Sequence, residues 1–97
     1  LKDYPRSRLA GAARLGLAYA DEGRKKWLDA EKLFVEAAKA VTGAENIAEA
    51  YLGAGRCAEA GGRLAQAVKW YEAAVAAGAE GYFRQAALDA LKEIKLR

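Results

Sequence analysis

The chain has 97 residues, 54% of them hydrophobic and 30% charged, with a formal net charge of +3. It contains no histidine and one cysteine, which excludes an internal disulfide, the common zinc sites and the Ser-His and Cys-His nucleophile pairs. The charge is too small to require a polyanionic partner, and no apolar run approaches the roughly 20 residues that span a bilayer. We therefore expect one small domain that is not an enzyme, with no cofactor, no metal and no membrane insertion.

Five helices are predicted, because the chain is rich in alanine and its apolar residues recur at three- and four-residue steps. The first runs from an N-cap at Ser7 to about Glu22, and the second from Trp27 to Val41. The others are predicted over Ala44 to Ala60, Arg63 to Ala77 and Glu80 to Lys95. The links between them are short and marked by glycine, so consecutive helices are expected to lie antiparallel.

The second half of the chain repeats the first. Two glycines inside predicted helices, Gly16 and Gly55, lie 39 positions apart. Because a glycine in an exposed helix costs about 1 kcal/mol relative to alanine, both are expected at close helix–helix contacts. Three further pairs lie 37 positions apart: Ala30 and Ala67, Phe34 and Tyr71, and Ala37 and Ala74. The difference predicts two extra residues in the Arg24–Trp27 turn, and a repeat of this length has to stack on copies of itself.

These residues resemble the tetratricopeptide repeat family and its Sel1-like relatives. The run Leu15-Gly16-x-x-Tyr19-x-x-x-Gly23 is similar to the family's first helix and turn. Two segments are similar to the second helix of the family's repeat: Ala30-x-x-x-Phe34-x-x-Ala37 and Ala67-x-x-x-Tyr71-x-x-Ala74. The stretch from Ala67 through Trp70-Tyr71 to Gly78 leans toward the Sel1-like variant. Tyr4-Pro5-Arg6-Ser7 resembles the repeat boundary of bacterial periplasmic and lipoprotein members.

The resemblance implies an all-α, right-handed solenoid of two repeats, about 7–42 and 44–78, and a capping helix over about 80–95. It is compatible with a segment of a longer repeat protein. It also implies a protein-binding scaffold or assembly factor of bacterial type, for which the boundary motif favours the periplasm over the cytoplasm. The partner, a protein or peptide rather than a small molecule, is expected in the concave groove, and the terminal repeats are expected to allow self-association. The expected groove residues are exposed positions of the first helix of each repeat: Ala13, Leu17, Ala20, Asp21, Glu49, Leu52, Arg56 and Glu59.

Four features carry alternatives. The alternative function is nucleic-acid binding through the basic Arg24–Lys26 turn, as opposed to a solvated turn over which Trp27 packs. Cys57 is expected to be a small buried hydrophobe rather than a reactive thiol. Trp70 and Tyr71 could form an aromatic platform for a ligand. The family pattern instead places Tyr71 in the core and Trp70 partly on the outer surface, at either an inter-repeat contact or a partner contact.

Overall fold

The computed structural model describes residues 6–97, with side chains from Ala10 onward, and all regular structure in this range is α-helical. The helix ends lie within two residues of those predicted. Ser7, the predicted N-cap, lies inside the first helix because that helix already begins at Arg6, and Tyr4 and Pro5 lie outside the described residues. The helices are α1 (Arg6–Gly23), α2 (Trp27–Ala40), α3 (Ala44–Ala60), α4 (Leu64–Ala76) and α5 (Tyr82–Lys95).

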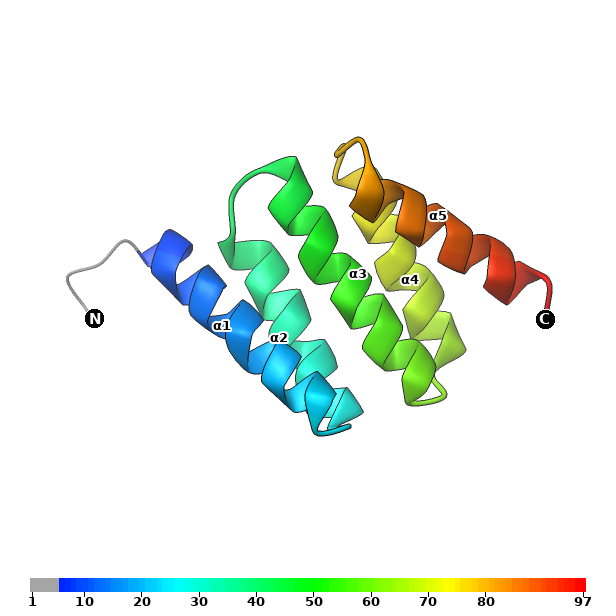
Figure 1. Cartoon of the computed structure of the whole chain (residues 1–97), viewed down its shortest axis with the longest axis horizontal. Coiled ribbons are helices and arrows are strands. Elements are labelled where there is room, and N and C mark those ends of the chain that lie inside the picture. Colours follow the sequence, from blue (N-terminus) through cyan, green and yellow to red (C-terminus); the bar gives the residue numbers. More distant parts are fainter. Residues whose placement is uncertain (1–5) are drawn as a thin grey trace.

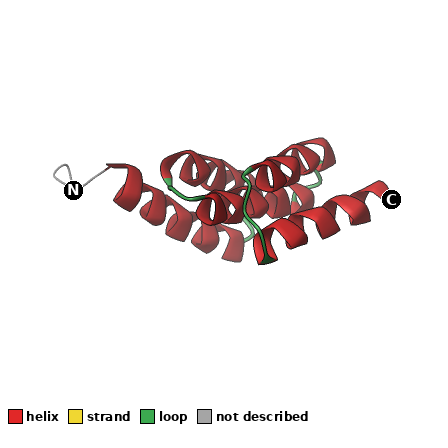
Figure 2. Cartoon of the chain, turned by 90° about the horizontal axis from the view of Figure 1, so that it is seen from above, coloured by secondary structure: helices red, strands yellow, loops and turns green. Residues whose placement is uncertain are grey.

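The helices pack in chain order as adjacent pairs. Each contacts the next helix along the chain, and α3 also contacts α5. Figure 1 shows α1, α3 and α5 in a front row with α2 and α4 behind them, and Figure 2 shows the same two rows from above. The particle measures 48 × 29 × 17 Å. Helix α3 is the central element, because it packs against α2, α4 and α5.

The core is organised around one aromatic ring in each back-row helix. Phe34 of α2 and Tyr71 of α4 are both buried, and each belongs to a different core cluster. Small residues surround the rings and let the helices approach closely. The core positions expected from the repeated pattern are confirmed, since the four alanines of that pattern are fully buried: Ala30, Ala37, Ala67 and Ala74.

The two helical hairpins, α1–α2 and α3–α4, each contain a turn of the same geometry. Arg24–Lys26 and Gly61–Arg63 each connect two helices with three residues. The middle residue has a positive φ in both turns, 63° at Lys25 and 81° at Gly62. The N–H of the last turn residue bonds to the carbonyl five residues before it, at 2.9 Å and 2.8 Å respectively, which is the Schellman arrangement at a helix end. The predicted two-residue insertion in the first turn is therefore wrong, and equivalent positions lie 37 apart throughout both hairpins.

This register pairs Gly16 with Gly53 rather than with Gly55. A Cβ added at Gly55 would lie 2.6 Å from the ring of Tyr71, so the close contact predicted there is confirmed. The close contact predicted at Gly16 is wrong, because a Cβ there would have no atom within 4 Å. At Gly53 a Cβ would lie 2.5 Å from the ring of Phe34. Pairing the glycines by identity therefore shifted the sequence alignment of α1 and α3 by two residues.

Candidate functional site

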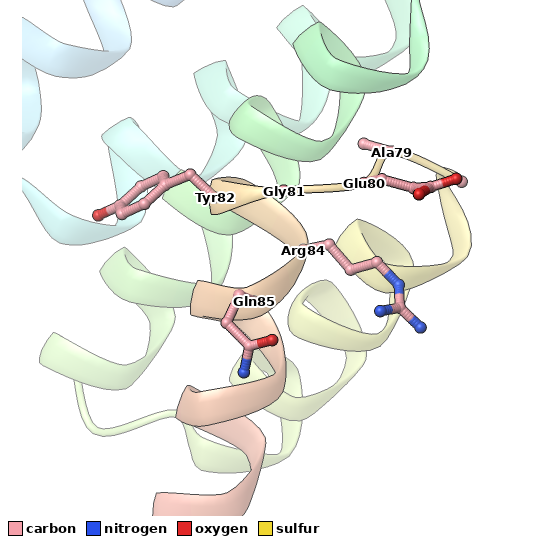
Figure 3. A pocket seen from close by; sticks show the side chains of 7 residues that line it. Ala79, Glu80, Gly81, Tyr82, Arg84 and Gln85 are labelled. Atoms are coloured by element: carbon pink, nitrogen blue, oxygen red, sulfur yellow. The ribbon is translucent and has the colours of Figure 1, made fainter.

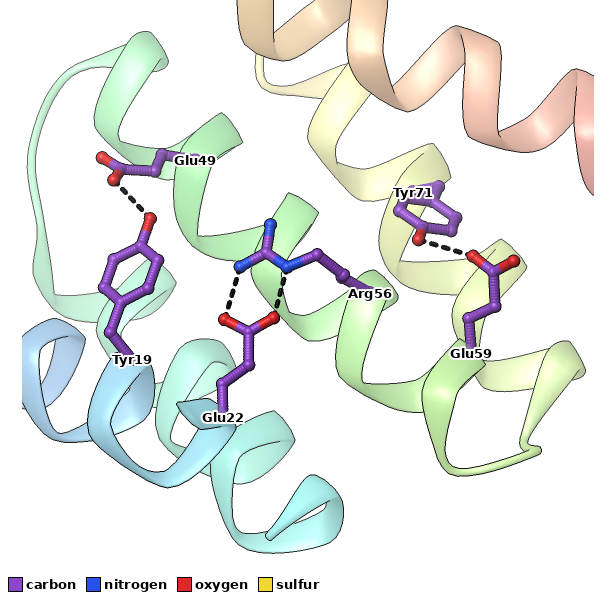
Figure 4. A network of polar contacts seen from close by, with 6 residues as sticks. All are labelled: Tyr19, Glu22, Glu49, Arg56, Glu59 and Tyr71. Atoms are coloured by element: carbon purple, nitrogen blue, oxygen red, sulfur yellow. Dashed lines mark hydrogen bonds and ion pairs between the residues drawn. The ribbon is translucent and has the colours of Figure 1, made fainter. Parts of the chain in front are cut away.

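Four polar side chains join α1 to α3 on the front row, as Figure 4 shows. The hydroxyl of Tyr19 donates to Glu49 Oε2 at 2.6 Å. Arg56 donates from Nε and from Nη2 to the two carboxylate oxygens of Glu22, with 2.7 Å between Nη2 and Oε1. Bidentate charged pairs of this kind fix geometry as well as adding energy. We refer to Tyr19, Glu22, Glu49 and Arg56 as the front cluster.

Aromatic rings lie close to the guanidinium of Arg56. Its Cζ is 5.7 Å from the ring centre of Phe34 and 6.0 Å from that of Tyr19. The two rings meet edge to face at 5.1 Å, and all of these are favourable cation–π and aromatic distances. The side chain of Arg56 is nevertheless 43% exposed and Tyr19 is 41% exposed. Both side chains are thus held in place while remaining accessible from solvent.

The surroundings move the titration of these two groups further from neutral pH. Burial, followed by the hydrogen bond to Glu49, raises the pKa of Tyr19 to about 12. The hydrogen bond to Glu22 raises the pKa of Arg56 above its already high ordinary value. Tyr19 is therefore a neutral donor and Arg56 a cation at neutral pH, and neither has a pKa suited to general acid–base catalysis there.

A second polar group follows farther along α3. The hydroxyl of Tyr71 donates to Glu59 Oε1 at 2.8 Å, and Arg97 donates to Glu59 Oε2 at 2.6 Å. Burial and the bond to Glu59 raise the pKa of the Tyr71 phenol. Glu22 and Glu59 are equivalent in the 37-residue register, and each accepts an arginine from outside its own helix: Arg56 for Glu22, and Arg97 for Glu59.

The predicted groove residues of α3 are only partly brought together. Glu49 and Arg56 belong to the front cluster, and Glu59 lies in the second polar group. Leu52 does not join them, because it is 8% exposed and packs in the core cluster that contains Ala87 of α5. The predicted exposure of Leu52 is therefore wrong. Its side of α3 is covered by α4 and α5, whose placement the sequence pattern did not reveal.

The predicted groove residues of α1 lie on a different side of that helix from the front cluster. Ala13, Leu17 and Ala20 are exposed, Leu17 by 59%, whereas Asp21 is half-buried. Each residue turns a helix by about 100°, so Leu17 and Tyr19 project about 160° apart. Leu17 and Arg56 therefore do not line one groove, contrary to the sequence prediction.

Two members of the front cluster, Tyr19 and Glu22, are absent from the residues predicted for the site. Tyr19 was interpreted as a marker of the first helix, and Glu22 as its last residue. The correct 37-residue register would have found both, because it aligns Tyr19 with Arg56 and Glu22 with Glu59. The signal was present in the sequence but was hidden by the pairing of Gly16 with a wrong partner.

The back row contains a buried carboxylate. Glu31 of α2 accepts hydrogen bonds from Arg63 and from Trp70 Nε1, the latter at 2.8 Å. This bond joins α4 to the first hairpin, so the inter-repeat contact considered for Trp70 is confirmed. The indole of Trp70 also stacks on Tyr51 of its own hairpin at 5.7 Å. Two adjoining grooves of about 420 and 450 Å³ run beside Glu31, and both are lined by the exposed side chain of Leu28.

The basic turn and Cys57 were considered for ligand-binding and reactive roles. Trp27 is half-buried against the core cluster around Phe34, as expected for a turn over which the indole packs. Arg24 in the same turn pairs with Asp21 at 3.6 Å. Cys57 is fully buried, and burial raises the pKa of its thiol to about 12. The interpretation of Cys57 as a small core residue is confirmed, since it packs in the cluster around Phe34.

An open hollow of about 790 Å³ lies at the connection between α4 and α5. It is lined by Gly78–Tyr82, Arg84 and Gln85. Figure 3 shows the side chains of Tyr82, Arg84 and Gln85 pointing in different directions rather than toward one point. A small-molecule site needs polar groups that converge on the ligand, so this hollow is a weaker candidate site than the front cluster.

Within residues 6–97 no group of three His, Cys, Asp or Glu side chains is placed to hold a metal ion. No helix in that range is long and apolar enough to cross a membrane. Comparisons of the chain with protein-family models, with curated proteins and with solved structures found no match. The described part of the chain is thus an all-α domain of five sequentially packed helices, with a cluster of fixed polar side chains on its front row.

Proposed function

We propose that this chain is a protein–protein interaction module of tetratricopeptide-repeat type, which binds a segment of a partner protein over the front cluster. The observation that carries the proposal is the pair formed by Tyr19 and Arg56. Both side chains are held by carboxylates of α1 and α3, yet each is about two-fifths exposed. Tyrosine and arginine are enriched among the residues that dominate binding energy, and fixing them in advance reduces the entropy lost on association.

The chemistry of the front row favours a protein segment over a polyanion. Glu22 accepts from Nε and Nη2 of Arg56, so Nη1 is left to donate to a partner's carbonyl or carboxylate oxygen. The front cluster and the polar group around Glu59 together contain more carboxylates than guanidinium groups: Glu22, Glu49 and Glu59 against Arg56 and Arg97. Nucleic acid needs an excess of positive charge along its path, and these two polar groups lack one.

The arrangement of the helices supports the same proposal. The first helices of the two hairpins, α1 and α3, stand side by side in the front row (Figure 1), and their equivalent positions lie 37 residues apart. In a right-handed solenoid built from such hairpins, the first helices line the concave face. We place that face on the front row, with the partner lying across α1 and α3 and engaging Tyr19 and Arg56 from both helices.

The experiment is to isolate a protein partner from a bacterial extract and then measure its affinity for purified variants. We expect Arg56→Ala to weaken binding about tenfold or more, which corresponds to about 1.4 kcal/mol. Arg84→Ala removes an exposed arginine of α5 and is the matched control, expected to change affinity less than about twofold. Because Arg56→Ala also removes the bond to Glu22, Tyr19→Phe serves as a milder second variant. A partner that binds both front-cluster variants normally would refute the proposal.

The alternative of nucleic-acid binding is tested by a salt titration with generic DNA and RNA. Affinity that falls steeply with salt, and that is lost when Lys25 and Lys26 are replaced by glutamine, would assign the function to the basic turn instead.

A further inference from the structure

The repeat register indicates which kind of element would pack on the exposed side of α1. Moving 37 positions along the chain takes Ala13, Gly16, Leu17 and Ala20 to Ala50, Gly53, Ala54 and Cys57. The four residues of α1 are exposed, whereas their four equivalents in α3 are all buried. In α3 this side is covered by α2, but among the described residues no helix packs on the same side of α1. We refer to Ala13, Gly16, Leu17 and Ala20 as the α1 edge.

The contacts of α2 with α3 show how such a side is filled. Phe34 packs over Gly53 and in one cluster with Ala54 and Cys57, where a Cβ at Gly53 would lie 2.5 Å from the ring. One turn later along α2, Ala37 and Ala38 pack against Ala50, so small residues face small residues there: Ala37, Ala38 and Ala50. The α1 edge keeps the glycine and the alanines of this interface although no described helix lies on it, at a cost of about 1 kcal/mol for Gly16 relative to alanine.

A charge in the turn after α1 repeats a second, independent feature of the interface. Arg63, the last residue of the second turn, forms an ion pair with Glu31 of α2. The equivalent of Arg63 is Lys26, which is exposed and forms no ion pair within the described part of the chain. In α2 the carboxylate of this ion pair, Glu31, lies three residues before the ring that packs on α3, Phe34. Lys26 is therefore positioned for a carboxylate at the same place on an incoming helix.

The α1 edge differs from the matching side of α3 at one position, and this difference determines how large the central side chain of the incoming helix can be. Leu17 stands where α3 has Ala54 and is three carbon atoms larger. An interface of fixed spacing does not accept this added volume without strain. A leucine in place of the phenylalanine on the incoming helix would remove a similar volume.

We propose that the α1 edge binds one amphipathic helix of a partner protein with the pattern Glu-x-x-Leu-x-x-Ala-Ala. The leucine would cover Gly16 beside Leu17, the alanines would pack against Ala13, and the glutamate would pair with Lys26. In a second copy of this chain the corresponding pattern with phenylalanine occurs twice, over residues 31–38 and residues 80–87. Neither is free to dock, because α2 lies between α1 and α3, and Phe83, Ala86 and Ala87 already pack in the core cluster that contains Tyr71. The α1 edge is separate from the front cluster, so the inference stands independently of the proposed function.

The probe is a synthetic peptide with the sequence of residues 26–42, carrying leucine at position 34. A lactam between Lys32 and Glu36, both exposed in α2, holds it helical, because an isolated helix of this length is marginal. Calorimetric titration into the full chain should show saturable one-to-one binding. Leu17→Glu should weaken it about tenfold or more. Leu28→Glu changes a leucine of similar exposure on the outer side of α2 and should change it less than about twofold.

Three further variants separate docking from folding and test the size of the central side chain. Gly16→Ala should have a melting temperature no lower than that of the parent protein, because an added Cβ there would have nothing within 4 Å. The same variant should nevertheless bind the peptide more weakly. Leu17→Ala recreates the cavity of the α2–α3 interface, so it should reverse the preference and bind the peptide with the natural Phe34 more tightly than the leucine version. Tyr19→Phe, a front-cluster variant, should bind like the parent protein.

Three results would overturn the inference. One is a lack of saturable binding by either peptide. Another is binding that is lost in Leu28→Glu but kept in Leu17→Glu, which would move the site to the groove beside α2. The third is a dimer of the parent chain that Leu17→Glu converts to a monomer in sedimentation, which would assign the α1 edge to a second copy.

Discussion

Adding one methyl group at each of two equivalent glycines should shift stability in opposite directions. Replacing glycine by alanine inside a helix stabilises it by about 1 kcal/mol. At Gly16 the new Cβ would meet no atom within 4 Å, so Gly16→Ala should retain this gain. At Gly53 it would lie 2.5 to 2.7 Å from three ring atoms of Phe34, far inside the roughly 3.5–4.0 Å of a favourable carbon contact. Phe34 is fully buried and has little room to retreat.

The overpacking at Gly53 should cost about 1–3 kcal/mol. Because the helix-propensity gain is common to both variants, it cancels in the comparison. Gly53→Ala should therefore be less stable than Gly16→Ala by the same 1–3 kcal/mol. For a domain of this size, that is a difference in Tm of at least about 4 °C. Thermal and urea unfolding followed by circular dichroism measure it.

A double-mutant cycle identifies the responsible contact. Phe34→Leu removes ring atoms, so Gly53→Ala should be tolerated better in that background than in the parent protein. Equal melting temperatures for Gly16→Ala and Gly53→Ala, or a cycle without coupling, would refute the packing of α2 on α3 described above.

Three further predictions follow from burial, titration and backbone geometry. Leu52→Ala should cost about 2–3 kcal/mol of unfolding free energy because Leu52 lies in the core, while Leu17→Ala should change it by less than about 0.5 kcal/mol; thermal melts showing the reverse order would restore an exposed Leu52. The pKa of Tyr19 is raised from 10.0 to about 12 in the fold, so its stabilising contribution is complete below about pH 10 and is lost toward pH 12, as the unfolded phenol ionises first. Tyr19→Phe should flatten this alkaline decline in urea titrations at stepped pH, and an unchanged slope would argue against the bond to Glu49. Lys25→Gly should stabilise the chain by about 1 kcal/mol, because Lys25 has a φ of 63° that glycine adopts without strain; a lower melting temperature would contradict the turn geometry.

Helix positions could be predicted from the sequence because their signals are local. The spacing of apolar residues and the glycines at the links predicted α3 over Ala44–Ala60, with the same bounds as in the structure. The burial of Phe34 and Tyr71 was also predictable, since both lie on the apolar stripe of their own helices. A stripe of this kind identifies the side of a helix that faces the core without reference to any other helix. In the candidate site, Glu49 and Arg56 were predicted because the resemblance to tetratricopeptide repeats places their positions in the groove.

The remaining features depended on which helices lie beside one another. Leu52 and Leu17 are both leucines on a first helix of a hairpin, but α4 and α5 cover the former while no described helix covers the latter. Glu22 meets Arg56 across 34 positions of chain, and no local pattern connects them. Burial and hydrogen bonding between helices depend on distances in space, which the tertiary structure sets. Periodicity along one helix reports only the direction in which each side chain projects.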